Sequence, residues 1–372
     1  MDPIALEDLQ TPCLLLDERR MARNVSRLNT HLDGLGVAFR PHLKTLKSVE
    51  AARRVVPGLT GPICVSTLLE AERFADAGAR DILYAVEIAP GKLARASALR
   101  ARGVDLILLV DGIDAARAVA AQARATDDPI PVLIEVDADN HRAGVRPDDA
   151  DTLVAIADAL RAGGAEPRGV LVHAGGSYGC QGAEAQAEFA ERERAAAVGA
   201  ATILRRAGHA APMVTVGSTP TAHAARGLDG VSEVRAGVHV LQDLVMAGIG
   251  VCAVDDIALS VLATVIGHQR DRNWVLVDAG WMAMSRDRGT QNQPVDQGYG
   301  LACDLDGVPW PDLIMTGANQ EHGILAIRPN SDAALPDLPV GARVRILPNH
   351  ACATAAQHDR YHVTDGTARR VH

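Results

Sequence analysis

Short apolar runs alternate with longer polar-rich segments along the first two thirds of the chain. The runs are rich in Val, Ile and Leu, which is typical of strands buried on both faces of a parallel sheet. Eight such strands are expected, at residues 37–40, 62–65, 82–85, 106–110, 132–136, 169–172, 213–216 and 233–240. Segments rich in Ala, Arg and Glu between them predict helices, among them 67–77, 113–124, 148–161 and 183–207. Eight strand–helix units favour a parallel (β/α)8 barrel, with an open doubly wound sheet as the alternative.

The pattern changes after about residue 251. Four further runs predict strands without intervening helices, at 257–268, 274–277, 344–347 and 361–363. The segment 285–306 between them is rich in Gly, Asp and Gln and shows no helical period. We therefore expect an α/β barrel over residues 18–250 and a mostly β domain over residues 251–372. A strand within residues 11–17 is expected to join the second domain.

Composition adds limits to this picture. The chain has 372 residues, enough for two domains, with 48% hydrophobic residues and a net charge of −9. The negative balance disfavours broad binding to nucleic acids or anionic membranes. No secretory leader and no apolar run of bilayer length is visible, and the six cysteines are scattered as in reducing compartments. We expect a soluble cytoplasmic protein.

Lys44 follows the first predicted barrel strand, in the segment Pro41-His42-Leu43-Lys44-Thr45. Catalytic residues of β/α barrels lie at the carboxyl ends of the strands. A partly desolvated lysine there can act as a nucleophile and form an imine with a carbonyl cofactor. Position alone favours the simpler interpretation, a surface lysine that opens a helix, as Lys47 does one turn on.

Two segments near the last barrel strands have the character of a phosphate cradle. Gly217, Ser218 and Thr219 lie between a strand and a helix, where backbone N–H groups and hydroxyls bind anions. Arg235, Gly237 and Val238 follow in the eighth strand and complete the cradle in this interpretation. An ordinary helix N-cap explains the serine and threonines equally well.

Two loops after the middle strands carry further candidates. Arg142 lies in His141-Arg142-Ala143-Gly144 and is either a cofactor ligand or a salt-bridged loop residue. Tyr178 ends His173-Ala-Gly-Gly-Ser177-Tyr178, where glycines allow a ligand to approach the backbone. The tyrosine either contacts a cofactor ring or packs in a glycine-rich turn.

His350 and Cys352 lie two positions apart near the carboxyl end, which on a strand places both side chains on one face. Imidazole and thiolate are zinc-type ligands, and a site with few protein ligands leaves positions open for water or substrate. Such a pair also occurs by chance, so alone it is a weak indication of a metal site.

Taken in order, these segments resemble a known family. Together with Gly217-Ser218-Thr219-Pro220-Thr221, Glu321-His322-Gly323 and Pro348-Asn349-His350-Ala-Cys352, they are similar to the eukaryotic-type D-serine dehydratases and D-threonine aldolases. These are metal-dependent pyridoxal-phosphate enzymes of the alanine-racemase fold. The resemblance runs from about Thr11 to Val363.

The resemblance implies roles for individual residues. Lys44 would hold pyridoxal 5'-phosphate as an internal aldimine, and His350 and Cys352 would bind a divalent metal, Zn2+ or Mn2+. The phosphate would be bound by Gly217, Ser218, Thr219, Gly237 and Val238, with Tyr178 against the cofactor. Arg235 and Arg142 remain alternatives for the partner of the pyridine nitrogen. The resemblance also implies an N-terminal barrel, a C-terminal β domain and a homodimer.

The expected activity is that of a lyase that dehydrates a D-3-hydroxy amino acid, either D-serine or D-threo-3-hydroxyaspartate, to a 2-oxo acid and ammonia. His-Ala-Cys resembles the dehydratase pattern, whereas the aldolases carry His-Cys-Asp. A D-threonine-type aldolase is the first alternative, and an amino-acid racemase or a non-catalytic pyridoxal-phosphate carrier are further ones. A racemase needs a second base opposite Lys44, which the sequence does not identify.

Overall fold

The protein is described here by a computed structural model, which covers residues 4–140, 142–365 and 370–371. Contacts divide the chain into two compact units, Arg27–Gly237 and a discontinuous unit of Met1–Ser26 with Val238–His372. The first unit is called the barrel below, and the second the β domain. This division assigns 238–250 to the β domain, whereas the sequence pattern grouped those residues with the barrel.

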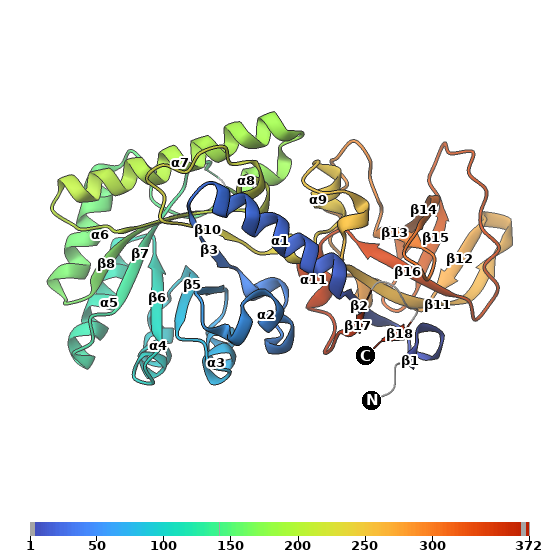
Figure 1. The fold of residues 1–372 in the computed structure, drawn as a ribbon, viewed down its shortest axis with the longest axis horizontal. Coiled ribbons are helices and arrows are strands. Elements are labelled where there is room, and N and C mark those ends of the chain that lie inside the picture. Colours follow the sequence, from blue (N-terminus) through green and yellow to red (C-terminus); the bar gives the residue numbers. More distant parts are fainter. Residues whose placement is uncertain (1–3, 141, 366–369, 372) are drawn as a thin grey trace. The chain divides into compact units, whose positions relative to one another are not determined.

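Eight parallel strands form the barrel (Figure 1). They are β3 (Ala38–Pro41), β4 (Ile63–Val65), β5 (Asp81–Glu87), β6 (Asp105–Val110), β7 (Pro131–Val136), β8 (Glu166–Val172), β9 (Met213–Val216) and β10 (Glu233–Ala236). Their order is β3-β10-β9-β8-β7-β6-β5-β4. A parallel bridge between His42 and Cys64 links the two ends of this row. The barrel is therefore nearly closed, which decides against the open doubly wound sheet.

Helices follow the strands and lie outside them (Figure 1). They are α2 (Val49–Val55), α3 (Leu68–Asp76), α4 (Leu93–Arg100), α5 (Ile113–Thr126), α6 (Ala150–Ala162), α7 (Ala183–Arg206) and α8 (Thr219–Ala224), while α1 (Glu18–Gly34) crosses the division between the units. Thr67 and Glu70 form a capping box that starts α3. Apolar side chains fill the barrel interior, among them Cys64, Leu83, Ile107, Leu109, Leu133 and Leu171.

The eighth strand is shorter than the sequence predicts. It ends at Ala236, and Val238–Val240 form a 3-10 turn, because Val238 O accepts hydrogen bonds from the backbone of Leu241 and Gln242. Gly237 lies between the two, and a Cβ there would come within 3.0 Å of Thr45 Oγ1. The close approach brings the end of β10 against the segment that carries Lys44.

The described residues of the β domain form one ten-stranded sheet. Its strands are β1 (Ile4–Ala5), β2 (Cys13–Asp17), β11 (Leu259–Gln269), β12 (Trp274–Val277), β13 (Gly300–Cys303), β14 (Pro309–Ala318), β15 (Gly323–Ile327), β16 (Arg343–Pro348), β17 (His362–Thr364) and β18 (Arg370–Val371). Three short helices interrupt the strands, α9 (Leu244–Gly248), α10 (Trp281–Met284) and α11 (Ala351–Ala355). As predicted, the N-terminal strand joins this sheet, where β2 pairs with β11 and β17.

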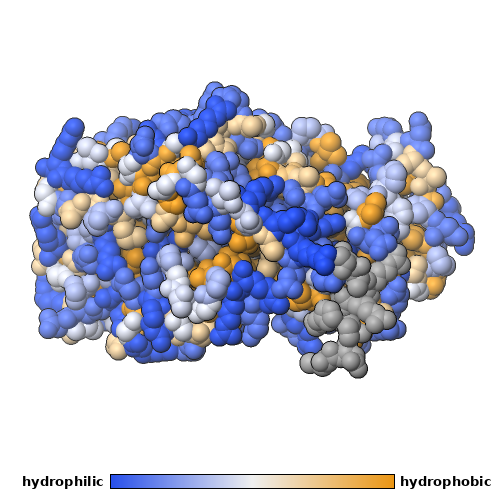
Figure 2. Space-filling model, in the orientation of Figure 1, coloured by the Kyte–Doolittle hydropathy of each residue, from blue (hydrophilic) through white to orange (hydrophobic). Residues whose placement is uncertain are grey.

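The two units expose mainly polar residues. Hydrophilic side chains cover much of the visible face in Figure 2, and the apolar ones are scattered among them. Within the described part of the chain, no helix combines the length and the apolar character that a bilayer crossing needs.

Candidate active site

Lys44 lies in the 3-10 turn Leu43–Thr45 directly after β3, at the carboxyl end of the barrel, and is half-buried. Its backbone N–H donates to Nδ1 of the buried His42. Burial lowers the pKa of His42 well below its usual value, and the positive charges of Lys44 and Arg235 lower it further. His42 is thus a neutral imidazole beside Lys44. The predicted lysine is at the end of the barrel where catalytic groups of this fold lie.

Gly217 and Ser218 form a tight turn between β9 and α8. Gly217 has φ 142°, and a Cβ there would lie 1.9 Å from Arg235 O, so only glycine fits. Its N–H donates to Glu193 Oε1 over 2.9 Å, and Ser218 caps α8 through Thr221. The simpler interpretation of this segment, a helix N-cap, is therefore present at the start of α8.

The hydroxyl of Thr219 is different. Thr219 Oγ1 is buried and has no hydrogen-bond partner among the described residues. A buried hydroxyl without a partner is costly unless a ligand supplies one. The turn therefore retains one polar group that fits a phosphate oxygen, in addition to the N-cap.

Arg235 is buried on β10, inside the barrel. Its Nε donates to Thr215 Oγ1 over 2.9 Å and its Nη2 donates to the backbone oxygen of Val172. Its charge reaches both His42 and His173. These contacts fix the guanidinium among the groups at the carboxyl end of the strands.

His173 and Tyr178 follow β8. His173 Nδ1 lies 2.9 Å from Gly217 O, and burial lowers the pKa of His173 to about 3. The Tyr178 ring belongs to the 3-10 segment Gly175–Gly179 and lies 6.4 Å from the His173 ring, measured between centroids. The structure thus brings Tyr178 to the same end of the barrel as the Gly217 turn.

Arg142 lies in the loop after β7, and half of its side chain is exposed. Its Nη2 is 3.2 Å from Oε1 of the buried Glu135. The arginine thus has the acidic partner that the salt-bridge interpretation expects, and part of its guanidinium remains accessible. His141, its neighbour in the motif, lies outside the described residues.

His350 and Cys352 do not lie on a strand, as the sequence led us to expect. Strand β16 ends at Pro348, His350 is the N-cap of α11, and Cys352 is in the first turn of that helix. Asp243 explains this conformation, because its Oδ2 accepts a hydrogen bond from the N–H of Ala351 at the start of the helix. The two side chains nevertheless meet, with a hydrogen bond between His350 and Cys352.

Asp287 is a residue of this site that the sequence did not reveal. Its Oδ2 lies 2.6 Å from Nδ1 of His350. Burial opposes a charge on His350, but hydrogen bonds to Asp287 and Cys352 raise the pKa of the imidazole to about 11. The environment therefore favours positive charge at this position. Asp287 lies in the Gly/Asp/Gln-rich segment, where one aspartate among many carried no recognisable signal.

No group of three or more His, Cys, Asp or Glu side chains that could hold a metal occurs within residues 4–140, 142–365 and 370–371. A metal at His350 and Cys352 would therefore keep positions open for water or substrate. Val238 also belongs to the β domain, whereas all other predicted cofactor residues are in the barrel.

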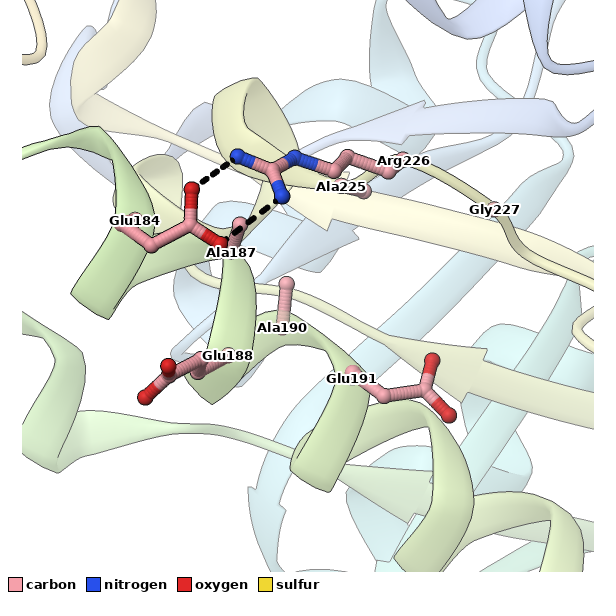
Figure 3. Close-up of a pocket in the computed structure, with 8 residues that line it drawn as sticks. All are labelled: Glu184, Ala187, Glu188, Ala190, Glu191, Ala225, Arg226 and Gly227. Atoms are coloured by element: carbon pink, nitrogen blue, oxygen red, sulfur yellow. Dashed lines mark hydrogen bonds and ion pairs between the residues drawn. The ribbon is translucent and has the colours of Figure 1, made fainter.

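A groove on the outside of the barrel contains none of these residues. It has a volume of about 370 Å³ and is lined by α7 and the end of α8 (Figure 3). An ion pair between Glu184 and Arg226 crosses it, with Glu188 and Glu191 along the same helix. This groove is separate from the predicted site.

Comparisons with known proteins agree with the geometry. Residues 16–243 match the model of the alanine racemase N-terminal domain, and residues 258–364 match that of a putative serine dehydratase domain. D-threo-3-hydroxyaspartate dehydratase of Delftia sp. (strain HT23) is 56% identical over 358 residues, which cover 95% of this chain and 93% of that protein. The chain belongs to the D-serine dehydratase and D-threonine aldolase family, of the alanine-racemase fold. The predicted family and fold are thus confirmed.

Other members of the family are also similar to this chain. D-threonine aldolase of Arthrobacter sp. is 32% identical over 366 residues, covering 96% of this chain and 89% of the aldolase. The solved structure of the Delftia sp. HT23 dehydratase has a TM-score of 0.94 at 53% identity and covers 99% of this chain and 98% of that one. Structures of that dehydratase also exist with a histidine or a cysteine replaced by alanine, the latter in the metal-free form. Like its relatives, this member of the family is a lyase.

Proposed function

We propose that this enzyme dehydrates D-threo-3-hydroxyaspartate to a 2-oxo acid and ammonia, with pyridoxal 5'-phosphate and a divalent metal, Zn2+ or Mn2+, as cofactors. The observation that carries the proposal is the His350–Cys352 pair, oriented by Asp287, in a chain 56% identical to a dehydratase of that name. The histidine and cysteine replaced in the variants of that dehydratase are also two positions apart.

The barrel residues fit the cofactor. Thr219 Oγ1 supplies the unpartnered hydroxyl, and Gly217 and Gly237 leave space that a Cβ would fill. Ser218 and the neighbouring Val238 complete the proposed phosphate contacts, and Tyr178 would contact the ring. Arg235 would face the pyridine nitrogen, since it is fixed inside the barrel, whereas Arg142 is half exposed.

Bound pyridoxal phosphate supplies a conjugated system that delocalises the negative charge left at the substrate's α-carbon. Lys44 would hold the cofactor and, once freed as an amine, would take the α-proton on Nζ. The neutral His42 beside it adds no second positive charge. Lys44 is thus both the cofactor's anchor and the base.

The residues of the β domain fit a metal. With Nδ1 of His350 occupied by Asp287, Nε2 is left for the metal, and the Cys352 thiolate is the second ligand. A divalent metal there would polarise the β-hydroxyl, which is a poor leaving group by itself. In an aldolase, deprotonation of the same hydroxyl would instead break the Cα–Cβ bond.

A product assay tests the proposal. Cofactor-loaded enzyme is offered D-threo-3-hydroxyaspartate, D-serine and D-threonine, with and without a chelator, and ammonia, 2-oxo acid and aldehyde are quantified. Chelator-sensitive ammonia, formed fastest from hydroxyaspartate, is expected. Cys352→Ala is expected to keep the cofactor's visible absorbance and lose most turnover. Glycine with an aldehyde would instead identify an aldolase.

We also propose that the enzyme is a cytoplasmic homodimer, as the resemblance implies. Multi-angle light scattering measures the oligomeric state directly, and a mass equal to one 39.1 kDa chain would contradict the dimer.

A further inference from the structure

Two carboxyl groups, those of the buried Glu135 and the half-buried Glu87, meet inside the barrel and have no part in the chemistry described above. Glu87 is the last residue of β5 and Glu135 lies near the end of β7, with β6 between the two strands. Alternate strands of such a barrel send side chains into the same interior layer, which explains why the two meet. Glu87 Oε1 and Glu135 Oε2 are both buried and have no other hydrogen-bond partner among the described residues, and the contact between the two side chains shifts the pKa of each.

A hydrogen bond between two carboxyl groups needs a proton on one of them. Two carboxylates in contact and away from water do not both ionise. Burial, followed by the contact with Glu87, raises the pKa of Glu135 to about 8, and the same contact lowers the pKa of Glu87. At neutral pH the pair therefore holds one proton and carries one negative charge, with the proton on Glu135.

Arg142 lies against this pair. Its Nη2 is 3.2 Å from Glu135 Oε1, and its charge also acts on Glu87. The Glu135 side chain is 2% exposed and that of Arg142 is 51% exposed, so a buried acid anchors an accessible guanidinium. One arginine and one net negative charge balance each other.

The groups on the neighbouring elements are apolar, neutral or bonded elsewhere. Between β5 and β7, the side chains of β6 from Leu106 to Val110 are apolar. After β8, His173 is the neighbour of Arg142, and its lowered pKa keeps it neutral. In the loop after β7, Asp139 Oδ2 accepts a hydrogen bond from the N–H of Gly176.

We propose that Glu87 and Glu135 are a positioning pair, which shares one proton and holds Arg142 at the carboxyl end of the barrel for an anionic oxygen of a bound ligand. The oxygen belongs either to the ring of pyridoxal phosphate or to the carboxylate of the amino-acid substrate. The ligand part rests on the proposed function, whereas the shared proton does not. Loss of the proton would leave two negative charges, which draw the guanidinium away from the ligand.

Infrared spectroscopy of the holoenzyme tests the shared proton. The wild-type spectrum minus that of Glu135→Gln is expected to contain the C=O stretch of a protonated carboxyl group at pH 7 and to lose it above pH about 8. Glu188→Gln, an exposed site on α7, is the matched control and should give no such band. Absence of the band in the wild type would overturn the pair, whatever the enzyme's substrate.

Ligand binding tests the positioning. The apoenzyme's Kd for pyridoxal phosphate and the holoenzyme's KM for D-threo-3-hydroxyaspartate are measured for Glu135→Gln, Glu135→Ala, Arg142→Ala and the double alanine variant. Glutamine mimics the protonated acid, so it should preserve both constants. Each single alanine variant should raise one of the two constants about tenfold, which is the effect of losing a hydrogen bond to a charged group. The double alanine variant should raise that constant no further than Arg142→Ala alone does.

The constant that changes identifies the source of the anionic oxygen: Kd for the cofactor, KM for the substrate. Additive losses in the double variant, or no loss in Glu135→Ala, would refute the positioning role. If circular dichroism shows that Glu135→Ala does not fold, the pH dependence of the same constant is compared between Glu135→Gln and the wild type. Ligand binding by the wild type should weaken above pH about 8, whereas binding by the glutamine variant should not.

Discussion

Asp287 Oδ2 accepts a hydrogen bond from Nδ1 of His350 over 2.6 Å. The bond fixes the imidazole ring and its tautomer, so that Nε2 is the nitrogen left for a metal. Metal-binding histidines are commonly oriented in this way, and loss of the orienting group typically costs 10- to 100-fold in metal affinity.

Asp287→Asn is therefore expected to weaken metal binding by about 10- to 100-fold. Competition with a fluorescent chelator measures the affinity without relying on turnover. Asp312→Asn, at an exposed ion pair with Arg328 in the same domain, is the control and should bind metal as the wild type does. Equal affinity in Asp287→Asn would show that the carboxylate does not orient the ligand.

Lys44→Ala should abolish the visible absorption band of the bound cofactor, because no other imine-forming amine lies at that position. Lys47→Arg should retain the band, since Lys47 is held in an ion pair with Glu70. The chain has only three lysines, at positions 44, 47 and 92, so borohydride reduction and peptide mapping distinguish them. Label on a peptide without Lys44 would contradict the assignment.

Gly217→Ala should destabilise the protein by roughly 2–4 kcal/mol, because the added methyl meets the backbone oxygen of Arg235 and the backbone has positive φ. Gly199→Ala, within α7, meets no atom within 4 Å and should stabilise by about 0.5–1 kcal/mol. Urea unfolding of the two variants beside the wild type measures both changes. Equal stabilities would refute the close approach of β9 and β10.

The raised pKa of Glu135 predicts a pH dependence of stability. Between about pH 4.5 and pH 8 the folded protein keeps a proton that the unfolded chain releases, so this group lowers the free energy of unfolding as the pH rises. Glu87, whose pKa is lowered, acts in the opposite sense but below that window. The stability of Glu135→Gln relative to the wild type should therefore increase from pH 5 to pH 8, as measured by urea unfolding. A constant difference would show that Glu135 is ionised throughout.

The barrel was predictable because its strands are buried on both sides. Continuous apolar runs such as Leu106–Val110 stand out against the amphipathic helices, and the observed strand covers 105–110. In the β domain the same reasoning succeeded for β2, β11, β12, β16 and β17 and missed β13–β15. Strand β14 contains two prolines, Pro309 and Pro311, and a glycine, and only its three middle residues, 313–315, are buried, so it gives no long apolar run.

The residues of the candidate site also fall into those that the sequence predicted and those that it did not. Lys44 and Gly217 were predictable because they directly follow strands, where local sequence and chain direction fix their place. The sequence did not reveal three other residues, because each acts through a contact with a residue distant in the sequence: Asp287, Glu87 and Glu135. The conformation at Cys352 was missed for a related reason, because the hydrogen bond from the N–H of Ala351 goes to Asp243, over a hundred positions earlier.

Strand β2 pairs with β11 and β17, although the whole barrel lies between them in the chain. The ribosome therefore releases β2 first and its partners last. The barrel's residues are all synthesised before the neighbours of β2 exist, so it can fold during translation, whereas the β domain can be completed only after synthesis has passed Thr364. A ribosome stalled between β10 and β11 would carry a formed barrel with an N-terminal strand that still lacks both of its partners.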